Sequence, residues 1–176
     1  MSAPINSQRM TARMDDAFCI FLIGMRINRP LKIHKWFPVA RAMPRMLREL
    51  EAHKELGYLG GHFWLGRSII SLQYWRSVAR LMEYATNKNM QHLPAWTAFT
   101  RSVGNSGDVG IWHETYAIGP GSSETIYHHM PPFGLGRVGN LVPATAISKT
   151  PKNGSETVKT SACYSLSAPI WPAVAL

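Results

Sequence analysis

The chain has 176 residues, a formal net charge of +9 and 45% apolar residues. That length suits one domain of ordinary size, and the apolar content excludes a wholly disordered chain. Its two cysteines are too few for a disulfide framework or a cysteine-rich zinc site, which favours a reduced, cytoplasmic compartment. The longest apolar run, residues 18–25, is much shorter than the roughly twenty residues that span a bilayer, so we expect no membrane span.

The basic residues are spread along the chain and form no run of five or more. No zinc-finger spacing and no RNA-binding segment accompanies them. The charge therefore predicts a solvated basic face or attraction for an anionic ligand, and nucleic acid is not an expected partner.

The first half of the chain predicts an arm, a strand and a helix. Residues 1–16 are polar and aperiodic, which indicates a flexible N-terminal arm. Residues 18–25 are apolar at consecutive positions, as in a strand that is covered on both faces. Residues 36–50 carry apolar side chains at spacings of three and four, which predicts a helix that Pro44 kinks or restarts and that Gly57 ends.

The next segments predict a hairpin, two helices and a last strand. Two strands are expected at residues 58–65 and 68–76. Ser77 is a suitable cap for a second helix, and residues 92–103 predict a third helical stretch before a strand at residues 109–118. The resulting order is βαββαβ, which predicts an α+β fold with a ferredoxin-like antiparallel sheet.

This domain is expected to span residues 17–136, with residues 137–176 as an irregular extension rich in Gly, Ser, Thr and Pro. Helices on one side cover only one face of a four-stranded sheet. The other face needs a cover of its own, and pairing with a second copy of the chain is the most economical one. The residues alone therefore predict a homodimer.

The last expected strand carries most of the candidates for chemistry. Alternation places Trp112, Glu114 and Tyr116 on one face of this strand and His113 on the other. A carboxylate beside two aromatic rings indicates a polar-lined cavity, whereas the alternative is a glutamate at the sheet rim paired with an arginine. His113 is either a general base or ligand, or a structural histidine.

Two other histidines bear on cofactors. His62 lies in the second expected strand, at the opposite edge of the sheet from His113, so the two cannot hold one metal ion within a chain. His92 begins the third helical stretch, where it either ligates a haem or completes the helix end. The sequence has no Gly-rich dinucleotide loop, no P-loop and no c-type haem attachment motif, which disfavours enzymes that use NAD, FAD or ATP.

Several segments together resemble one family. They are FLIGMRIN at 21–28, HKWFPVA at 34–40, YWRS at 74–77, HLPAW at 92–96, WHETY at 112–116 and MPPFGL at 130–135. The family was long a domain of unknown function and is now named after a monooxygenase of fungal fumagillin biosynthesis. The resemblance covers about residues 18–136 and implies a dimeric α/β barrel, as in antibiotic-biosynthesis monooxygenases, haem-degrading monooxygenases and aldoxime dehydratases.

The resemblance implies a monooxygenase-like enzyme of secondary metabolism whose partner is a small apolar molecule, either a polyketide, a terpenoid or an aromatic metabolite. A cofactor-free mechanism needs a base, for which His113 and Glu114 are the candidates. It also needs donors to a developing enolate, for which Arg26 and Asn28 are the candidates. The expected substrate-binding residues are His62, Trp75, Trp96, Trp112 and Tyr116.

Two alternatives stay open at this point. One is a haem-dependent lyase or dehydratase of the aldoxime dehydratase type, with His92 as the haem-binding residue. The other is a non-catalytic module that holds a hydrophobic ligand in the barrel. The expected cofactor is therefore none or haem, and no metal ion is predicted.

Overall fold

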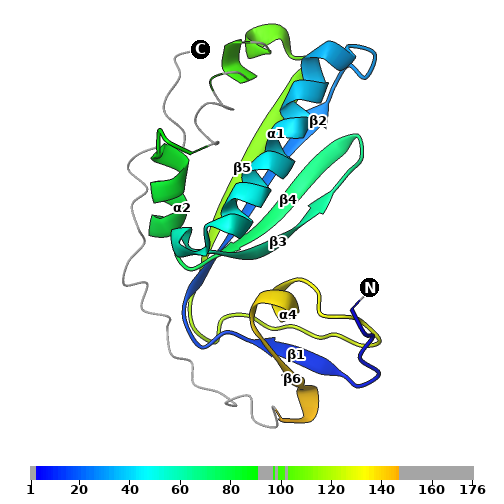
Figure 1. Cartoon of the computed structure of the whole chain (residues 1–176). Coiled ribbons are helices and arrows are strands. Elements are labelled where there is room, and N and C mark those ends of the chain that lie inside the picture. The colour runs from blue at the N-terminus through cyan, green and yellow to red at the C-terminus, as the bar shows by residue number, and fades with distance from the viewer. Residues whose placement is uncertain (1–2, 91–96, 98, 102, 147–176) are drawn as a thin grey trace, which may run out of the picture. The chain divides into compact units, whose positions relative to one another are not determined.

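The computed structural model describes residues 3–90, 97, 99–101 and 103–146, and these form two compact units. The larger unit runs from Met14 to Ser123. The smaller unit combines residues 3–13 with residues 124–146. Figure 1 labels the α-helices and strands of both units, which are described separately below.

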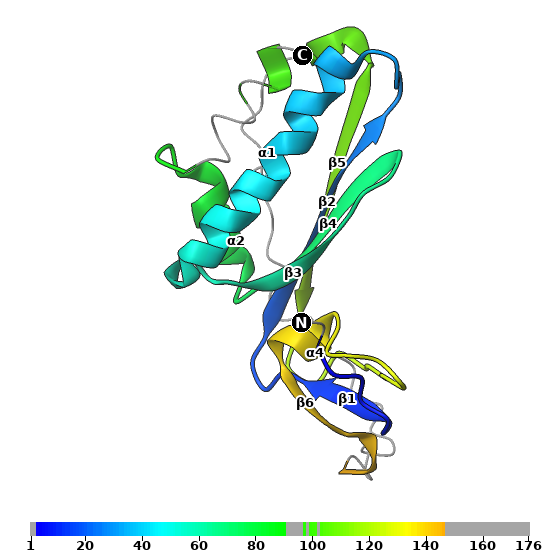
Figure 2. The ribbon, with the colours of Figure 1, turned by 45° about the vertical axis from the view of Figure 1, so that its right-hand side comes forward.

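The larger unit has the element order βαββαβ. Its antiparallel sheet has the order β3-β4-β2-β5, made of β2 (Phe18–Ile27), β3 (Tyr58–Trp64), β4 (Ser68–Trp75) and β5 (Val109–Ile118). Helices α1 (Ile33–Ala52) and α2 (Val78–Thr86) lie on the same face of the sheet (Figures 1 and 2). Short 3₁₀ helices η1 (Lys54–Leu56) and η2 (Gly104–Ser106) precede β3 and β5. The predicted ferredoxin-like fold is confirmed.

Helix α1 runs without interruption through Pro38 and Pro44, so the second of the two predicted outcomes, a restart at Pro44, does not occur. A proline inside a helix removes one backbone donor. The residues that follow Pro44 keep the helix in place, because Met46 and Leu50 are buried. Among the described helices, none is both long and apolar enough to cross a membrane.

Helix α2 begins as the sequence predicts. The Ser77 side chain accepts a hydrogen bond from the backbone N–H of Arg80, which satisfies a donor that the first helical turn leaves open. Leu81, Tyr84 and Ala85 are buried on the inner side of the helix.

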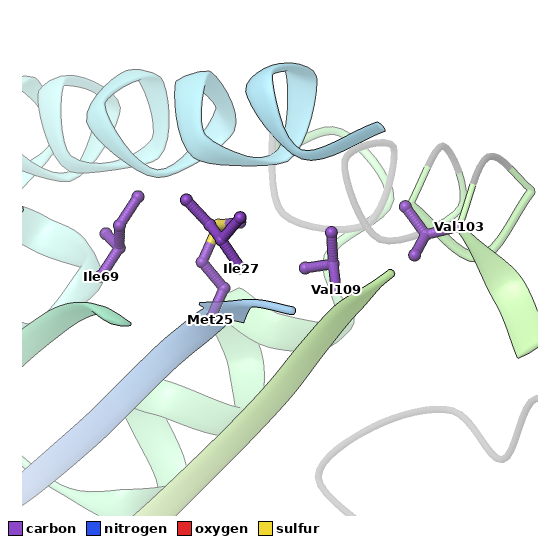
Figure 3. Packing of buried hydrophobic residues seen from close by; sticks show 5 residues of the cluster. All are labelled: Met25, Ile27, Ile69, Val103 and Val109. Carbon is purple, nitrogen blue, oxygen red and sulfur yellow. The ribbon is translucent and has the colours of Figure 1, made fainter. Parts of the chain in front are cut away.

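The apolar core lies between the sheet and α1. Figure 3 shows the side chains of Met25, Ile27, Ile69 and Val109 beneath the helix, with Val103 beyond its end. All of them are buried, and Trp36, Val39 and Ala40 of α1 pack against them. Burial of this stripe explains why a helix with two prolines stays continuous on the sheet.

A buried carboxylate ties the ends of β2 and β5 to the start of α1. Asp108 is 1% exposed and accepts hydrogen bonds from Lys32 Nζ at 3.0 and 3.1 Å, while Arg29 Nε lies 3.4 Å from it. The hydrogen bond from Lys32 lowers the pKa of Asp108, and the charge of Arg29 adds to this. The Asn28 side chain donates to the carbonyl of Gly107 at 3.0 Å, so it stabilises the same corner.

The register of the sheet sorts its side chains onto two faces. Odd-numbered residues of β2, β4 and β5 point toward the helices, as Met25, Ile69 and Val109 do in the core. Even-numbered residues point to the opposite face, which no described helix or strand of this unit covers (Figure 2). We call the two surfaces the helix-facing side and the bare face.

The smaller unit brings together two segments that were expected to be irregular. Strand β1 (Met10–Arg13) pairs antiparallel with β6 (Asn140–Pro143), and α4 (Leu135–Val138) precedes β6, with the 3₁₀ helix η3 (Ala144–Ala146) after it. The flexible arm predicted over residues 1–16 therefore contains a strand, and the extension predicted from residue 137 begins with regular structure. Neither segment shows this alone, because each four-residue strand depends on its distant partner. Residues 147–176 lie outside the described part of the chain.

Candidate functional site

Four polar side chains share the helix-facing side of the sheet, and we call them the polar quartet: Ser71, Gln73, His113 and Thr115. The register places Ile23 of β2 between Ser71 and His113. Two residues along the same strand, Phe21 lies between Gln73 and Thr115. Strands are about 4.8 Å apart, so opposite members of the quartet have backbones about 10 Å apart.

Two members of the polar quartet are buried and joined to each other. Ser71 is 1% exposed and Gln73 is 4% exposed. The Trp75 indole donates to Gln73 Oε1 at 3.0 Å, and Gln73 Nε2 donates to Ser71 Oγ at 3.3 Å. Gln73 Nε2 also lies 3.9 Å from Met43 Sδ of α1. Buried polar groups cost free energy unless they are paired, so this chain of contacts is a specific feature of the unit.

Thr115 differs from its neighbours because its hydroxyl is left unsatisfied. Its Oγ1 is buried and has no hydrogen-bond partner among the described residues. A buried hydroxyl without a partner costs about 1–3 kcal/mol. Such a group in a native fold is a place for a water molecule or a ligand atom.

His113 brings a titratable group to the same side of the sheet. The side chain is half-buried, and its ring centre lies 5.8 Å from that of Phe21. Burial lowers the pKa of His113 below its usual value. The imidazole is therefore neutral near pH 7 and able to accept a proton.

Aromatic residues pack beside the polar quartet. Trp75 is fully buried, and its ring lies 5.6 Å from that of Tyr58 and 5.7 Å from that of Tyr84. The Tyr84 hydroxyl donates to Glu49 Oε2 of α1 at 2.9 Å. Burial and this hydrogen bond raise the pKa of Tyr84, so the phenol stays neutral. The cluster forms a dry wall next to Gln73.

The bare face carries a different set. Tyr116 donates to Glu114 Oε2 at 2.7 Å, and both side chains are exposed. This hydrogen bond raises the pKa of Tyr116. Trp112 lies over Gly24, where an added Cβ would come within 2.6 Å of the indole nitrogen. The absence of a side chain at Gly24 therefore lets the Trp112 ring approach the backbone of β2 closely.

The predicted site residues are thus divided between two faces of one sheet. His113 and Trp75 lie on the helix-facing side, whereas Glu114, Trp112, Tyr116 and His62 lie on the bare face. His62 and His113 are also at opposite edges, on β3 and β5.

Of the remaining predicted residues, Arg26 lies on the bare face at the end of the sheet, and the others join neither set. Arg26 is exposed near the end of β2, and the Asn28 amide is engaged with Gly107. His92 and Trp96 lie outside the described residues. Within the described residues, no three His, Cys, Asp or Glu side chains gather closely enough to hold a metal ion.

The site residues predicted from the sequence do not include Ser71, Gln73 or Thr115. The sequence does contain a pattern that could have identified Ser71 and Gln73. Polar residues two positions apart in a buried strand point to the same face, where they need hydrogen-bond partners. The sequence also separates the two faces of each strand correctly. It does not reveal which face the helices cover, and that decides which set is enclosed.

The fold of this chain has a counterpart among solved structures. A crystal structure of the aldoxime dehydratase OxdRE in complex with butyraldoxime is similar, with a TM-score of 0.63 and 14% sequence identity over 79% of this chain. The chain spans only 42% of the length of that enzyme chain. The likeness therefore concerns the fold.

Two smaller proteins are similar at lower TM-scores. SnoaB, a cofactor-independent oxygenase from Streptomyces nogalater, has a TM-score of 0.41 and 11% identity, covering 57% of this chain and 91% of its own. A dimeric protein of unknown function with a ferredoxin-like fold from Bacteroides fragilis has a TM-score of 0.41 and 13% identity, covering 60% and 99%. No curated protein matches the chain in sequence.

The family comparison covers most of the chain. The family described as Monooxygenase af470-like matches residues 18–135. This range includes the whole βαββαβ sheet, from the start of β2 to the end of β5. It also confirms the resemblance found in the sequence. The chain belongs to the monooxygenase af470-like family.

Proposed function

We propose that the chain is a small oxygenase that oxidises an apolar metabolite with molecular oxygen and without a bound cofactor. The observation that carries this proposal is His113, a half-buried histidine on the helix-facing side. Burial keeps its imidazole neutral at neutral pH, and three other polar side chains share this side. Membership of a monooxygenase-like family supports the same class of reaction.

The reaction needs a substrate with an acidic C–H bond in a CH2 group beside a carbonyl, either in a ketone or in the keto tautomer of a phenol. The His113 imidazole takes that proton, and the carbanion gives one electron to O2. The carbon radical and superoxide then combine into a peroxide, which recovers the proton from the imidazolium. Loss of water leaves a new carbonyl group. The net change is CH2 + O2 → C=O + H2O, so oxygen is the oxidant and no external reductant is consumed.

The surroundings of His113 make it a better candidate for the catalytic base than Glu114. Phe21 and Ile23 lie beside it on the neighbouring strand, so the floor of the site is apolar. Apolar walls exclude water, which protects a carbanion until it meets oxygen. Glu114 is exposed and faces the other way, so we assign no catalytic role to it.

The proposal is tested by oxygen uptake with naphthalene-1,3-diol, whose keto tautomer carries an acidic CH2 group beside its carbonyl. The expected product is 2-hydroxy-1,4-naphthoquinone, formed with one water per O2 consumed. A rate no faster than the uncatalysed oxidation, with the compound bound, would favour a module that only holds a hydrophobic ligand. A Soret band after expression with added haem, lost in His92→Ala, would favour a haem-dependent lyase instead.

We also propose that a second copy of the chain covers the bare face, giving a homodimer. Trp64 and Tyr116 are 42% and 46% exposed there. Ile70 and Leu72 of β4 lie on the same face. Large exposed apolar patches mark association surfaces in soluble proteins.

Charge on the bare face favours a second copy as the cover. One row of side chains runs straight across this face of the sheet: His62, Leu72, Leu22 and Glu114. The histidine is at one end of the row and the glutamate is at the other. If two such faces meet about a two-fold axis along the strands, each Glu114 lies opposite the partner subunit's His62. Two such pairs would then enclose the leucines at the centre.

Sedimentation equilibrium tests this arrangement. Glu114→Gln and His62→Gln should each weaken self-association by about tenfold, because each leaves a charged or polar partner unpaired. Glu83→Gln, on the exposed side of α2, is the matched control and should leave it unchanged. A monomeric wild-type protein, or variants that associate as tightly as the wild type, would contradict the proposed pairing.

A further inference from the structure

The orientation of the Gln73 carboxamide is set by Trp75. An indole N–H can only donate, so the group facing it must be the amide oxygen, and the two atoms are 3.0 Å apart. Trp75 is fully buried and Gln73 is 4% exposed, so water does not compete for this contact. The amide nitrogen must therefore point away from Trp75, toward Ser71 and Met43.

The amide NH2 group of Gln73 has two N–H donors, and only one of them has a strong acceptor. One N–H is directed at Ser71 Oγ at 3.3 Å, and the other contact is the Met43 thioether at 3.9 Å. A thioether is a weak acceptor. Ser71 accepts from the amide, so its own hydroxyl hydrogen is directed elsewhere. A ligand oxygen that replaced the flexible Met43 side chain would gain a much stronger hydrogen bond.

We infer that Gln73 and Ser71 form the subsite for an ionised substrate oxygen, a phenolate or enolate, and that Trp75 is the positioning residue for this subsite. The inference rests on the proposed function for the location of the substrate. It adds the chemistry that the substrate must carry: an ionisable oxygen on one side of the carbon that reacts.

The spacing of the row supports this arrangement. Ser71, Ile23 and His113 lie side by side on three adjacent strands, so the oxygen subsite and the base are about 10 Å apart at the backbone. The inference places a flat apolar ring system over Ile23 and Phe21, which lie between the two groups and are 7% and 6% exposed. Its oxygen then meets the amide while its C–H bond meets the imidazole. Thr115, whose buried hydroxyl has no described partner, is available to a second oxygen on the same ring system.

A fixed amide and a hydroxyl in a dry site stabilise an oxyanion, because both donors are already oriented when the charge forms. Hydrogen bonds to the charged form lower the pKa of the group that carries it. A phenol bound in this subsite should therefore ionise at a lower pH than it does in water. This effect is measurable without any turnover.

The test uses 2-naphthol, whose neutral and ionised forms differ in absorbance and fluorescence. The wild-type protein should bind the ionised form and lower the apparent pKa of the probe. Gln73→Leu and Trp75→Phe should each weaken binding of the naphtholate by about tenfold, the usual worth of a hydrogen bond to a charged group. Gln73→Glu, which keeps an acceptor for Trp75 but removes the donors, should weaken it more.

A double-mutant cycle separates positioning from packing. If Trp75 acts through Gln73, Trp75→Phe has no further effect on naphtholate binding once Gln73 is leucine. An undiminished effect of Trp75→Phe in that background would overturn the positioning role. Wild-type-like binding by Gln73→Glu, or no lowered pKa of the probe on the wild-type protein, would overturn the subsite. Thermal unfolding of each variant verifies that it is folded.

These outcomes are independent of the proposed oxygenase activity. If the protein lowers the pKa of bound 2-naphthol but consumes no oxygen, the oxyanion subsite is supported and the oxygenase activity is contradicted. A protein that oxidises naphthalene-1,3-diol at the same rate with leucine at position 73 would retain the oxygenase and lose the subsite.

Discussion

The two faces of the central sheet carry opposite chemistry. On the helix-facing side, polar side chains such as Ser71 and Gln73 are buried, where they cost free energy unless they are paired. On the bare face, Trp64 and Tyr116 are exposed, where water penalises them. Each departure from the ordinary pattern has its own explanation: the buried polar groups are suited to chemistry and the exposed apolar groups to association.

The largest expected effect is on the free energy of unfolding, which should respond differently to substitutions on the two sides of the sheet. Leu50 of α1 is 1% exposed and belongs to the packing of the helix, so Leu50→Ala should lower the free energy of unfolding by about 3 kcal/mol. Leu22→Ala removes a half-buried side chain from the bare face and should cost less. Chemical denaturation at several protein concentrations measures both.

Concentration sharpens this first comparison. Association stabilises by mass action, so the loss caused by Leu22→Ala should grow with protein concentration, whereas the loss caused by Leu50→Ala should not. Equal and concentration-independent losses would mean that the bare face is not an interface.

The next effect concerns the base. His113→Gln keeps a polar side chain but cannot accept a proton, so oxygen uptake with naphthalene-1,3-diol should fall by about 100-fold or more. His53→Gln is the matched control, because His53 is an exposed histidine bonded to Glu55 near the end of α1. Turnover that survives in His113→Gln would remove the assigned base.

A smaller effect is the pH dependence of turnover. The neutral imidazole is the active form, so kcat/KM should fall on the acid side by about tenfold per pH unit. Because burial lowers the pKa of His113, this fall should begin below about pH 6.5, the ordinary value for histidine. Phe21→Leu opens the cover beside the ring and should move the midpoint upward. A rate that rises as pH falls would contradict the role of a neutral base.

The smallest effect lies at the corner where β5 begins. The pKa of Asp108 is lowered in the folded chain, chiefly by the hydrogen bond from Lys32, so its contribution to stability is present at neutral pH and is lost as pH falls through that lowered pKa. Asp108→Asn should therefore flatten the decline of Tm between neutral pH and about pH 3. Asp16→Asn, an exposed residue, should leave the decline unchanged.

The sequence predicts the architecture of the larger unit well. The consecutive apolar residues of β2, the stripe of α1 and the Ser77 cap are local patterns, and local patterns determine where elements form. The continuation of α1 through Pro44 is not local. It depends on the burial of Met46 and Leu50 in tertiary contacts, which a propensity argument does not contain.

The site is less predictable for a related reason. Alternation correctly separates His113 from Glu114, yet both remain equal candidates until the helices are placed on one face. The role assigned to Gln73 depends on its contacts with Trp75, two residues along the same strand, and with Met43 of α1. The sequence alone does not show these contacts. The pairing of β1 with β6 joins residues more than 120 apart and has no signal in either segment.

The central claim is that the chemistry belongs to one chain and lies on its helix-facing side. Leu22→Asp places a charge at the centre of the bare face and should produce a monomer, without touching the polar quartet. The most direct test is the oxygen uptake per chain of this monomer, with circular dichroism to verify folding. We expect turnover close to that of the wild type. A folded monomer that has lost turnover would mean that the reaction needs the bare face closed by a second subunit.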